Sequence, residues 1–405
     1  MPRILKDDPA IMQIAQPNSL PVPDDDSAAH SLLVDKHIRG RIADVGTSIS
    51  FAEFMHEALY APGLGYYSAG ATKFGAAGDF VTAPEVSTLF GKVLARQCAS
   101  VLAGIEAADV LEIGAGSGKL AADMIRKLGD LDALPRHYSI LEVSAELRER
   151  QADRLRREVP DYFANIRWLT QLPHDHRGVI VANEVLDALP VERFLRREND
   201  VAQLRVAVEQ DRFVFTARSA PDLLANAVFR IEQELGHRLP AGYSSEVCLA
   251  APGWISDLAA SLDLGVAFLF DYGVSRREYY AADRSDGWLR CHFRHHAHSD
   301  PLILPGIQDL TAWVDFSVIA AAAVDAGLNI EGYVTQAHFL LDGGLADELA
   351  DFADLQADAQ LELSGQVKLL TLPGEMGEKF KCLGISRGSV TRPAGLGGND
   401  RTHSL

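Results

Sequence analysis

The most constraining stretch of the sequence is DVLEIGAGSGKL, residues 109–120. A short apolar run ends there in a glycine-rich turn before a helical segment, an arrangement that often holds nucleotide-like ligands. From residue 110 onward, the apolar runs VLEIG, YSILE, IRWL and GVIVANE alternate with helical patterns that begin after Lys119 and span Ala145 to Val159. This order predicts an α/β fold, with a mainly parallel sheet and helices on both faces.

The rest of the chain divides into further segments by composition. Residues 1–48 carry several acidic residues and are expected to be a disordered arm, and the polar, glycine-rich residues 389–405 a disordered tail. The main domain is expected over 49–388. Within it, a glycine- and aromatic-rich packed loop at 60–90 is expected to cover the ligand. An antiparallel meander followed by a helix predicts an inserted small α+β subdomain at about 190–245.

Two capping boxes predict where helices begin. Ser50 and Glu53 have the required spacing for a helix that ends near residue 59. Thr82 and Glu85 repeat that spacing and predict a helix that continues to about Leu102.

Composition excludes some classes of partner. The formal net charge of −18 argues against a nucleic-acid partner and favours a basic one. No apolar run is long enough for insertion into a membrane. The four cysteines are far apart without a C-x-x-C pair, which favours a reducing compartment. Because the first thirty residues are acidic, unlike a mitochondrial transit peptide, we expect a cytoplasmic protein.

The glycine-rich turn itself discriminates between ligands. Gly114, Gly116 and Gly118 form G-x-G-x-G, with Lys119 where the dinucleotide fingerprint needs its third glycine, so NAD is disfavoured. A phosphate-binding P-loop would need glycine at Ile113 and Ser or Thr after the lysine, so ATP is disfavoured as well.

Two carboxylates accompany this turn. Glu112 lies two residues before Gly114, and Glu142 ends the next strand, where it can accept hydrogen bonds from two ribose hydroxyls. The pattern resembles motif I of the class I S-adenosylmethionine-dependent methyltransferases. In those enzymes the glycines allow the backbone to approach the ligand, and the carboxylate faces its cationic methionine end.

Longer stretches resemble one family within that class. These stretches are GYYSAGATKFGAAGDFVTAPEVSTLFG, LEIGAGSGKLAADM, LEVSAELRERQ, VANEVLDALPVERF, FLFDYG, HSDPLILPGIQDLTAWVDF and MGEKFKCLGIS. They look like the MidA family, also called the mitochondrial complex I assembly factor 7 family, in the same order and from about Ser50 to Gly388.

The resemblance implies a class I methyltransferase fold with an inserted subdomain. In the mitochondrial members it also implies symmetric dimethylation of an arginine on the 49-kDa subunit of respiratory complex I. One departure is GWLRCH at residues 287–292, where relatives tend to have Gly-Thr-Leu-Arg-x-Tyr. Trp288 and His292 therefore distinguish the substrate loop of this chain.

Methyl transfer to an arginine requires carboxylates that hold its cationic guanidinium. ANEVLDALP supplies them just after a strand, at the edge where open α/β sheets bind ligands. We expect Asn183 to face the cofactor and Glu184 and Asp187 to face the substrate as catalytic residues. Asp187 could equally cap a helix, and Asp271, which ends a later strand, could equally be a turn residue.

Two other segments carry polar groups of interest. Thr82, Pro84 and the free amides at the start of the next helix suit the methionine carboxylate of the cofactor. The cluster CHFRHHAHSD invites a metal site, but adjacent histidines on a strand do not share a face. We therefore expect no metal, and interpret His298 as a loop anchor.

Two functions of different class remain after these arguments. The first is a protein-arginine methyltransferase that uses S-adenosylmethionine, and the second is an assembly factor that binds this molecule without catalysis. The pair Glu184 and Asp187 favours the first. The expected partner is a protein substrate, such as a complex I subunit. Whether the chain forms a homodimer stays open.

Overall fold

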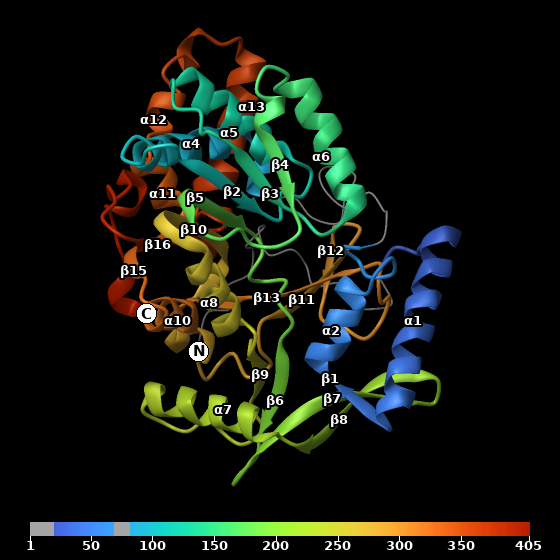
Figure 1. Cartoon of the computed structure of the whole chain (residues 1–405). Coiled ribbons are helices and arrows are strands. Elements are labelled where there is room, and N and C mark those ends of the chain that lie inside the picture. Colours follow the sequence, from blue (N-terminus) through green and yellow to red (C-terminus); the bar gives the residue numbers. More distant parts are fainter. Residues whose placement is uncertain (1–19, 69–81) are drawn as a thin grey trace.

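The structure is a computed structural model that describes residues 20–68 and 82–405. Its central element, counted over those residues, is an eight-stranded sheet with helices on both faces (Figure 1). The order of its strands is β15 (Asn329–Thr335), β16 (Phe380–Arg387), β10 (Leu262–Val274), β5 (His176–Asn183), β2 (Asp109–Ile113), β3 (Tyr138–Leu141) and β4 (Ile166–Leu169), and β14 (Val314–Asp315) pairs with β10. The predicted α/β fold is confirmed.

Most of this sheet is parallel. β10, β5, β2, β3 and β4 run in one direction, whereas β16 runs antiparallel to both of its neighbours, β10 and β15. The carboxyl ends of the parallel strands therefore meet at one edge of the sheet, where ligands bind in folds of this kind.

Side chains of the central strands alternate between two cores. In β10, Val266, Phe268 and Phe270 pack on one face, and Ala267 and Leu269 pack on the other. An uninterrupted apolar run is expected for such a strand, because both of its faces are buried.

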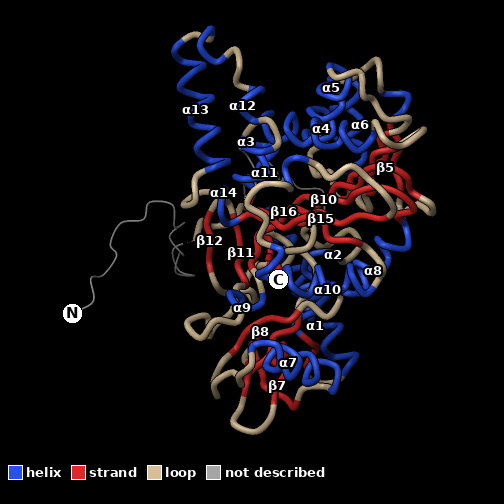
Figure 2. Tube along the Cα trace, turned by 90° about the vertical axis from the view of Figure 1, so that its left-hand side faces the viewer, coloured by secondary structure: helices blue, strands red, loops and turns tan. Residues whose placement is uncertain are grey.

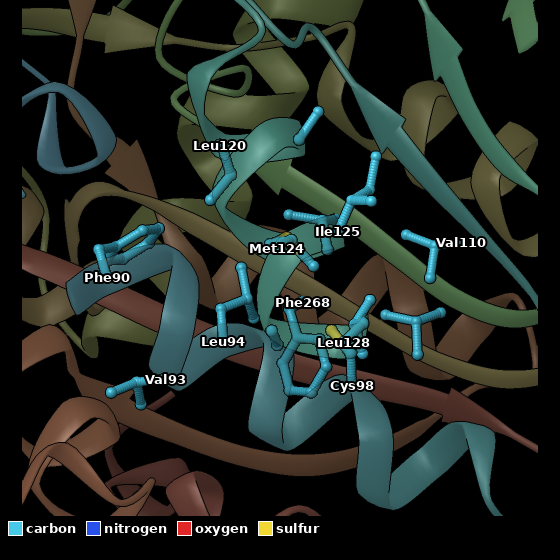
Figure 3. Close-up of a cluster of buried hydrophobic side chains, with 14 of the residues drawn as sticks. Phe90, Val93, Leu94, Cys98, Val110, Leu120, Met124, Ile125, Leu128 and Phe268 are labelled. Carbon is cyan, nitrogen blue, oxygen red and sulfur yellow. The ribbon is translucent and has the colours of Figure 1, made fainter. Parts of the chain in front are cut away.

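Helices supply the rest of both cores. The first face is covered by α4 (Thr88–Leu102), α5 (Lys119–Asp130), α6 (Ala145–Glu158) and α11 (Gln336–Asp342), and the second by α8 (Ala251–Ser261) and α10 (Phe316–Asp325). Figure 3 shows Leu94 and Cys98 of α4 and Met124 of α5 among the side chains packed around Val110 and Phe268. The chain then adds α12 (Leu345–Glu348), α13 (Ala357–Thr371) and α14 (Met376–Lys379) before β16.

A second, antiparallel sheet lies in the lower part of Figure 1, and Figure 2 shows it on the same side of the main sheet. It consists of β6 (Glu192–Arg196), β7 (Val201–Glu209), β8 (Arg212–Ser219) and β9 (Ser244–Val247), with α7 (Asp222–Leu235) packed against it. These elements lie where the inserted subdomain was expected. The strand β1 (Ser48–Ser50) also joins this sheet by pairing with β7.

A third sheet has the order β12 (His296–His298), β11 (Leu289–Phe293) and β13 (Asp309–Ala312), and follows α9 (Arg276–Tyr279). Its buried side chains share a core with α1 (Asp25–Val45) and α2 (Phe51–Tyr60). None of the described helices is long and apolar enough to cross a membrane.

The structure differs from the sequence-based expectation at both ends of the chain. Much of the arm expected to be disordered forms α1, because Val34, Ile38 and Ile42 make a buried stripe one helical turn apart. The C-terminal tail is also structured: it contains the 3₁₀ turn Ala394–Leu396, and Leu396 is fully buried. Residues 1–19 lie outside the described residues.

The capping boxes had different outcomes. Ser50 caps α2 in a complete capping box with Glu53, as predicted. The helix expected from Thr82 to Leu102 is instead split at Ser87, which caps α4 and follows the four-residue helix α3 (Ala83–Val86). Thr82 makes no side-chain cap bond. Residues 69–81 of the loop expected to cover the ligand lie outside the described residues.

Candidate active site

A cavity of about 370 Å³ opens at the carboxyl edge of the parallel strands. It is bordered by the ends of β2, β3 and β5, by the start of β13, and by the segments that flank residues 69–81. Nine of the ten residues predicted for the site line it: Thr82, Pro84, Glu112, Gly114, Gly116, Glu142, Asn183, Glu184 and Asp187. Gly118 does not line the cavity but begins α5 beside it.

The glycine turn has the backbone that its sequence requires. Gly114, Gly116 and Gly118 have φ values of 69°, 51° and 78°, in the left-handed region that other residues rarely adopt. A Cβ atom on Gly118 would lie 3.3 Å from the side chain of Gln151. The turn thus presents bare backbone to the cavity and packs closely on its other side.

Gln151 of α6 connects this turn to Glu142. Its side-chain amide donates to the carbonyl of Gly116 at 3.0 Å and to Glu142 Oε2 at 3.2 Å, and its oxygen accepts from Trp168 Nε1 at 2.9 Å. Sequence reasoning missed Gln151. The available signal was a polar residue in the apolar stripe of α6, between Leu147 and Leu155.

Two carboxyl groups, those of Glu112 and Glu142, lie in the part of the cavity that is predicted to bind the cofactor, called the cofactor half below. Both are buried and hydrogen-bonded. Glu112 accepts from the hydroxyl of Tyr138 at 2.7 Å, and burial raises its pKa to about 7. Glu142 accepts from the amide of Ser144 at 2.9 Å, and burial raises its pKa as well, against the effect of this hydrogen bond. Both therefore present acceptors in a dry environment.

The turn after β5 carries the two predicted catalytic residues. Glu184 has a φ of 55°, a strained value for a residue with a side chain, and its amide donates to the carbonyl of Phe270 at 2.9 Å. Asp271 Oδ2 accepts the amides of Leu186 at 2.8 Å and Asp187 at 3.1 Å. Asp271 thus holds the turn in place. This is the turn-residue role that the sequence analysis gave as its alternative.

Glu184, Asp187 and Asp309 bring three carboxyl groups to the part of the cavity that is predicted to bind the substrate, called the substrate half below. The pKa of Glu184 is raised well above its usual value by burial and then by the charge of Asp187. That of Asp187, which is 4% exposed, is raised by burial, by Asp271 and by Asp309. Among the described residues that line the cavity, none is Lys or Arg. The described lining of the cavity is therefore rich in carboxyl groups, which a cationic ligand can bind.

In the segment at Thr82 and Pro84, one backbone amide has a partner within the protein. A hydrogen bond from the Ala83 amide lowers the pKa of Glu184, so this amide is directed at a protein carboxylate. Glu85 accepts a hydrogen bond from the Ser117 hydroxyl and so connects α3 to the glycine turn. Binding of a methionine carboxylate by Thr82 and Pro84 stays a prediction.

Sequence reasoning also missed a wall of the cavity that consists of the rings of Tyr60 and Tyr67 and the carboxyl group of Asp309. Tyr67 donates to Asp309 Oδ1 at 2.9 Å, and Tyr60 donates to the carbonyl of Ala188 at 2.9 Å. The two rings stack with centroids 5.6 Å apart. His292 lies opposite Asp309 in the sheet and also lines the cavity. Burial lowers its pKa to about 4, so its imidazole is neutral at pH 7.

The histidine-rich segment shows no metal site in the part of the chain that the structure describes: no group of three or more His, Cys, Asp or Glu side chains is placed to hold an ion. His298 is fully buried, and its Nδ1 accepts the amide of Asp300 at 3.4 Å. These contacts are those of a residue that holds its loop.

Comparison with known proteins identifies the family. Residues 93–334 match the model of a family described as S-adenosyl-L-methionine-dependent methyltransferases. The chain is 30% identical to the protein arginine methyltransferase NDUFAF7, mitochondrial, of Danio rerio, covering 86% of each chain, and 29% identical to that of Homo sapiens, covering 85% of this chain and 81% of the relative.

A solved structure agrees over nearly the whole chain. A protein from Burkholderia thailandensis, crystallised with S-adenosyl-homocysteine, is 40% identical and superposes with a TM-score of 0.90 over 96% of this chain and 100% of its own. The curated relatives are mitochondrial proteins, and this finding contradicts the cytoplasmic location that the acidic N-terminus predicted.

The cavity suits the cofactor of this family. S-adenosylmethionine has an ammonium group and two ribose hydroxyls, which need acceptors, and an adenosine that must approach the backbone closely. Glu112 and Glu142 supply buried acceptors, and Asn183 Oδ1 is buried with no hydrogen-bond partner in the described structure. The chain belongs to the family of MidA and mitochondrial complex I assembly factor 7, and it is an S-adenosyl-L-methionine-dependent methyltransferase.

Proposed function

We propose that this enzyme methylates the guanidinium group of an arginine in a protein substrate. The observation that carries the proposal is the substrate half of the cavity, where Glu184, Asp187 and Asp309 gather and no described lining residue is Lys or Arg. A guanidinium is planar and cationic, and carboxylates bind it through paired, charge-assisted hydrogen bonds. The names of the curated relatives, which are protein arginine methyltransferases, support the same substrate class.

On the cofactor side, we propose that the glycine turn, Glu142 and Asn183 hold S-adenosylmethionine, with Glu112 toward its ammonium group. When bound, this cofactor supplies an electrophilic methyl group on a sulfonium. The protein must then exclude water and align the arginine nitrogen with that methyl group. Glu142 is pre-positioned for this by Gln151, and Asn183 by its hydrogen bond to Glu184 Oε1 at 3.0 Å.

On the substrate side, Glu184 is the residue that activates the arginine. Its carboxylate binds the guanidinium and localises the nitrogen lone pair that forms the new N–C bond, while the electrons of the broken S–C bond stay on sulfur. The nitrogen must also lose a proton, and Glu184 accepts it. A raised pKa makes a carboxylate a better proton acceptor near neutral pH. Asp187 balances the remaining charge.

The substrate that we propose is a complex I subunit of the 49-kDa type or its bacterial counterpart, as the family resemblance implies. The net charge of −18 is consistent with a basic segment around the target arginine. The competing function is an assembly factor that binds the cofactor without catalysis. The geometry favours catalysis, because Glu184 sits in a strained backbone conformation at the cavity.

The test compares the parent with Glu184→Gln and Asp187→Asn. Labelled methyl incorporation into the purified subunit is measured together with cofactor affinity by calorimetry. We expect Glu184→Gln to lower transfer by about 10² or more while cofactor affinity stays nearly constant, because an amide cannot provide the charged bond. Glu106→Gln, at an exposed position outside the cavity, is the matched control.

Two outcomes would contradict the proposal. If the parent transfers no methyl group to arginine yet promotes assembly of the complex, the binding-only function replaces it. If the parent is active and both variants keep full activity, the two carboxylates are structural.

A further inference from the structure

The start of β13 and the predicted catalytic turn both border the cavity. Asp309, its first residue, is 1% exposed overall and lines the cavity. It belongs to the small sheet with β11 and β12, so it reaches the site from a different part of the fold than Glu184. Its charge raises the pKa values of both Glu184 and Asp187, which places the three carboxyl groups in one electrostatic environment.

The spacing between Asp309 and the turn is fixed by hydrogen bonds. The amide of Ala312, at the end of β13, donates to the carbonyl of Asp187 at 2.9 Å. A second connection runs through the aromatic wall: Tyr67 holds Asp309 Oδ1, its ring stacks on Tyr60, and Tyr60 binds the carbonyl of Ala188. The start of β13 and the turn after β5, which are far apart in sequence, are thereby held at a set distance.

A guanidinium can use such an arrangement, whereas an ammonium cannot use it equally well. The guanidinium has five N–H donors in a rigid plane, so carboxylates on two sides can bind different edges of it. The lysine ammonium has three donors on one compact nitrogen, so it does not extend between two separate carboxylates as a planar guanidinium does. Aromatic rings beside the carboxylates add a surface on which a guanidinium can stack.

We propose that Asp309, oriented by Tyr67, binds the substrate guanidinium opposite Glu184, and that this pair selects arginine over lysine. This inference rests on the proposed function and adds a specificity-determining residue to it. Glu184 acts on the nitrogen that receives the methyl group, and Asp309 binds the far edge of the guanidinium. Tyr60 and Tyr67 flank the aliphatic part of the side chain.

The experiment uses the full chain, S-adenosylmethionine, and two peptides that differ only in having Arg or Lys at the methylated position. Asp309→Asn should lower kcat/KM for the arginine peptide by about 10², mainly through KM, and the ratio of Arg to Lys turnover should fall. Tyr67→Phe should lower kcat/KM for the arginine peptide about 10-fold, the cost of one hydrogen bond. Cofactor affinity should stay unchanged in both variants, which a general structural defect would not allow.

A double-mutant cycle then tests the orientation by Tyr67. If Tyr67 acts through Asp309, adding Tyr67→Phe to Asp309→Asn should cause almost no further loss. Tyr67→Phe removes a single oxygen, so it tests the inference even where Asp309→Asn fails to fold. Full arginine activity in either single variant would overturn the inference. An inactive parent would instead overturn the proposed function.

Discussion

The two halves of the cavity differ in how their carboxyl groups are partnered. In the cofactor half, Gln151 spans the glycine turn and Glu142, and Glu112 accepts from Tyr138. In the substrate half, carboxyl groups repel one another, and the backbone at Glu184 is strained. Glu112 and Glu142 in the first half therefore have hydrogen-bond partners within the protein. The second gathers carboxyl groups among its described residues, which a cationic substrate would bind.

The comparison separates stability from catalysis within one cavity. Satisfied buried networks stabilise a fold, whereas clustered like charges reduce its stability and are kept where function needs them. Substitutions in the cofactor half should therefore weaken binding of the cofactor. Substitutions in the substrate half should remove activity and leave the fold unchanged or more stable.

The largest expected effect is in the cofactor half. Gly116→Val should abolish the rise in melting temperature that S-adenosylmethionine and S-adenosyl-homocysteine cause, because φ at this position is 51° and valine would be strained there. Thermal unfolding with and without ligand measures the effect. Gly129→Val, at a helix position with open space around it, is the matched control and should keep the shift. An equal shift in both variants would contradict the role of the turn.

The next effect concerns pH and the substrate half. Only ionised Glu184 binds a guanidinium, and its pKa is raised well above 4.5, so kcat/KM for an arginine substrate should increase with pH through that raised value. Below it, activity should fall by about tenfold per pH unit. The profile is measured at saturating cofactor. A rate that is flat from pH 5 to about 8 would show that the active carboxyl group has an ordinary pKa.

A smaller effect is expected at Gln151. Gln151→Leu leaves the Gly116 carbonyl, Glu142 and Trp168 without their partner, so cofactor affinity should fall about 10-fold. At saturating cofactor, kcat should change little. Calorimetry and steady-state kinetics separate the two quantities. Arg156→Leu on the exposed side of the same helix is the control, and equal affinities in the two variants would remove Gln151 from the site.

The smallest effect is on stability. The pKa of Asp187 is higher in the folded protein than its usual 3.8, so its ionisation disfavours folding, and its cost is present above that raised pKa and absent below 3.8. Asp187→Asn should therefore raise the melting temperature by a few degrees at pH 8, but not at pH 4. A variant that melts lower at pH 8 would show that this carboxylate is stabilising.

The cofactor half could be predicted from the sequence because its groups are local. Glu112 and the three glycines lie within seven residues of one another, 112–118, and Glu142 ends the next strand. The wall of Tyr60, Tyr67 and Asp309 could not be predicted from neighbouring residues in the sequence. Tyr67 and Asp309 are brought together only by the packing of distant elements. The arm was misjudged for another reason: its acidic residues obscured the stripe of Val34, Ile38 and Ile42.

The pairing of strands within the sheets determines which part of the chain can fold as a unit. The matched family region, residues 93–334, excludes β16, which lies in the interior of the main sheet between β10 and β15. It also excludes β1. Because β1 pairs with β7, which lies about 150 residues later in the chain, β1 can form this pairing only after β7 has been synthesised. A fragment cut at those borders would have unpaired strand edges and should aggregate. For this enzyme, the stretch that the family model matches is smaller than the stretch that cooperative folding requires.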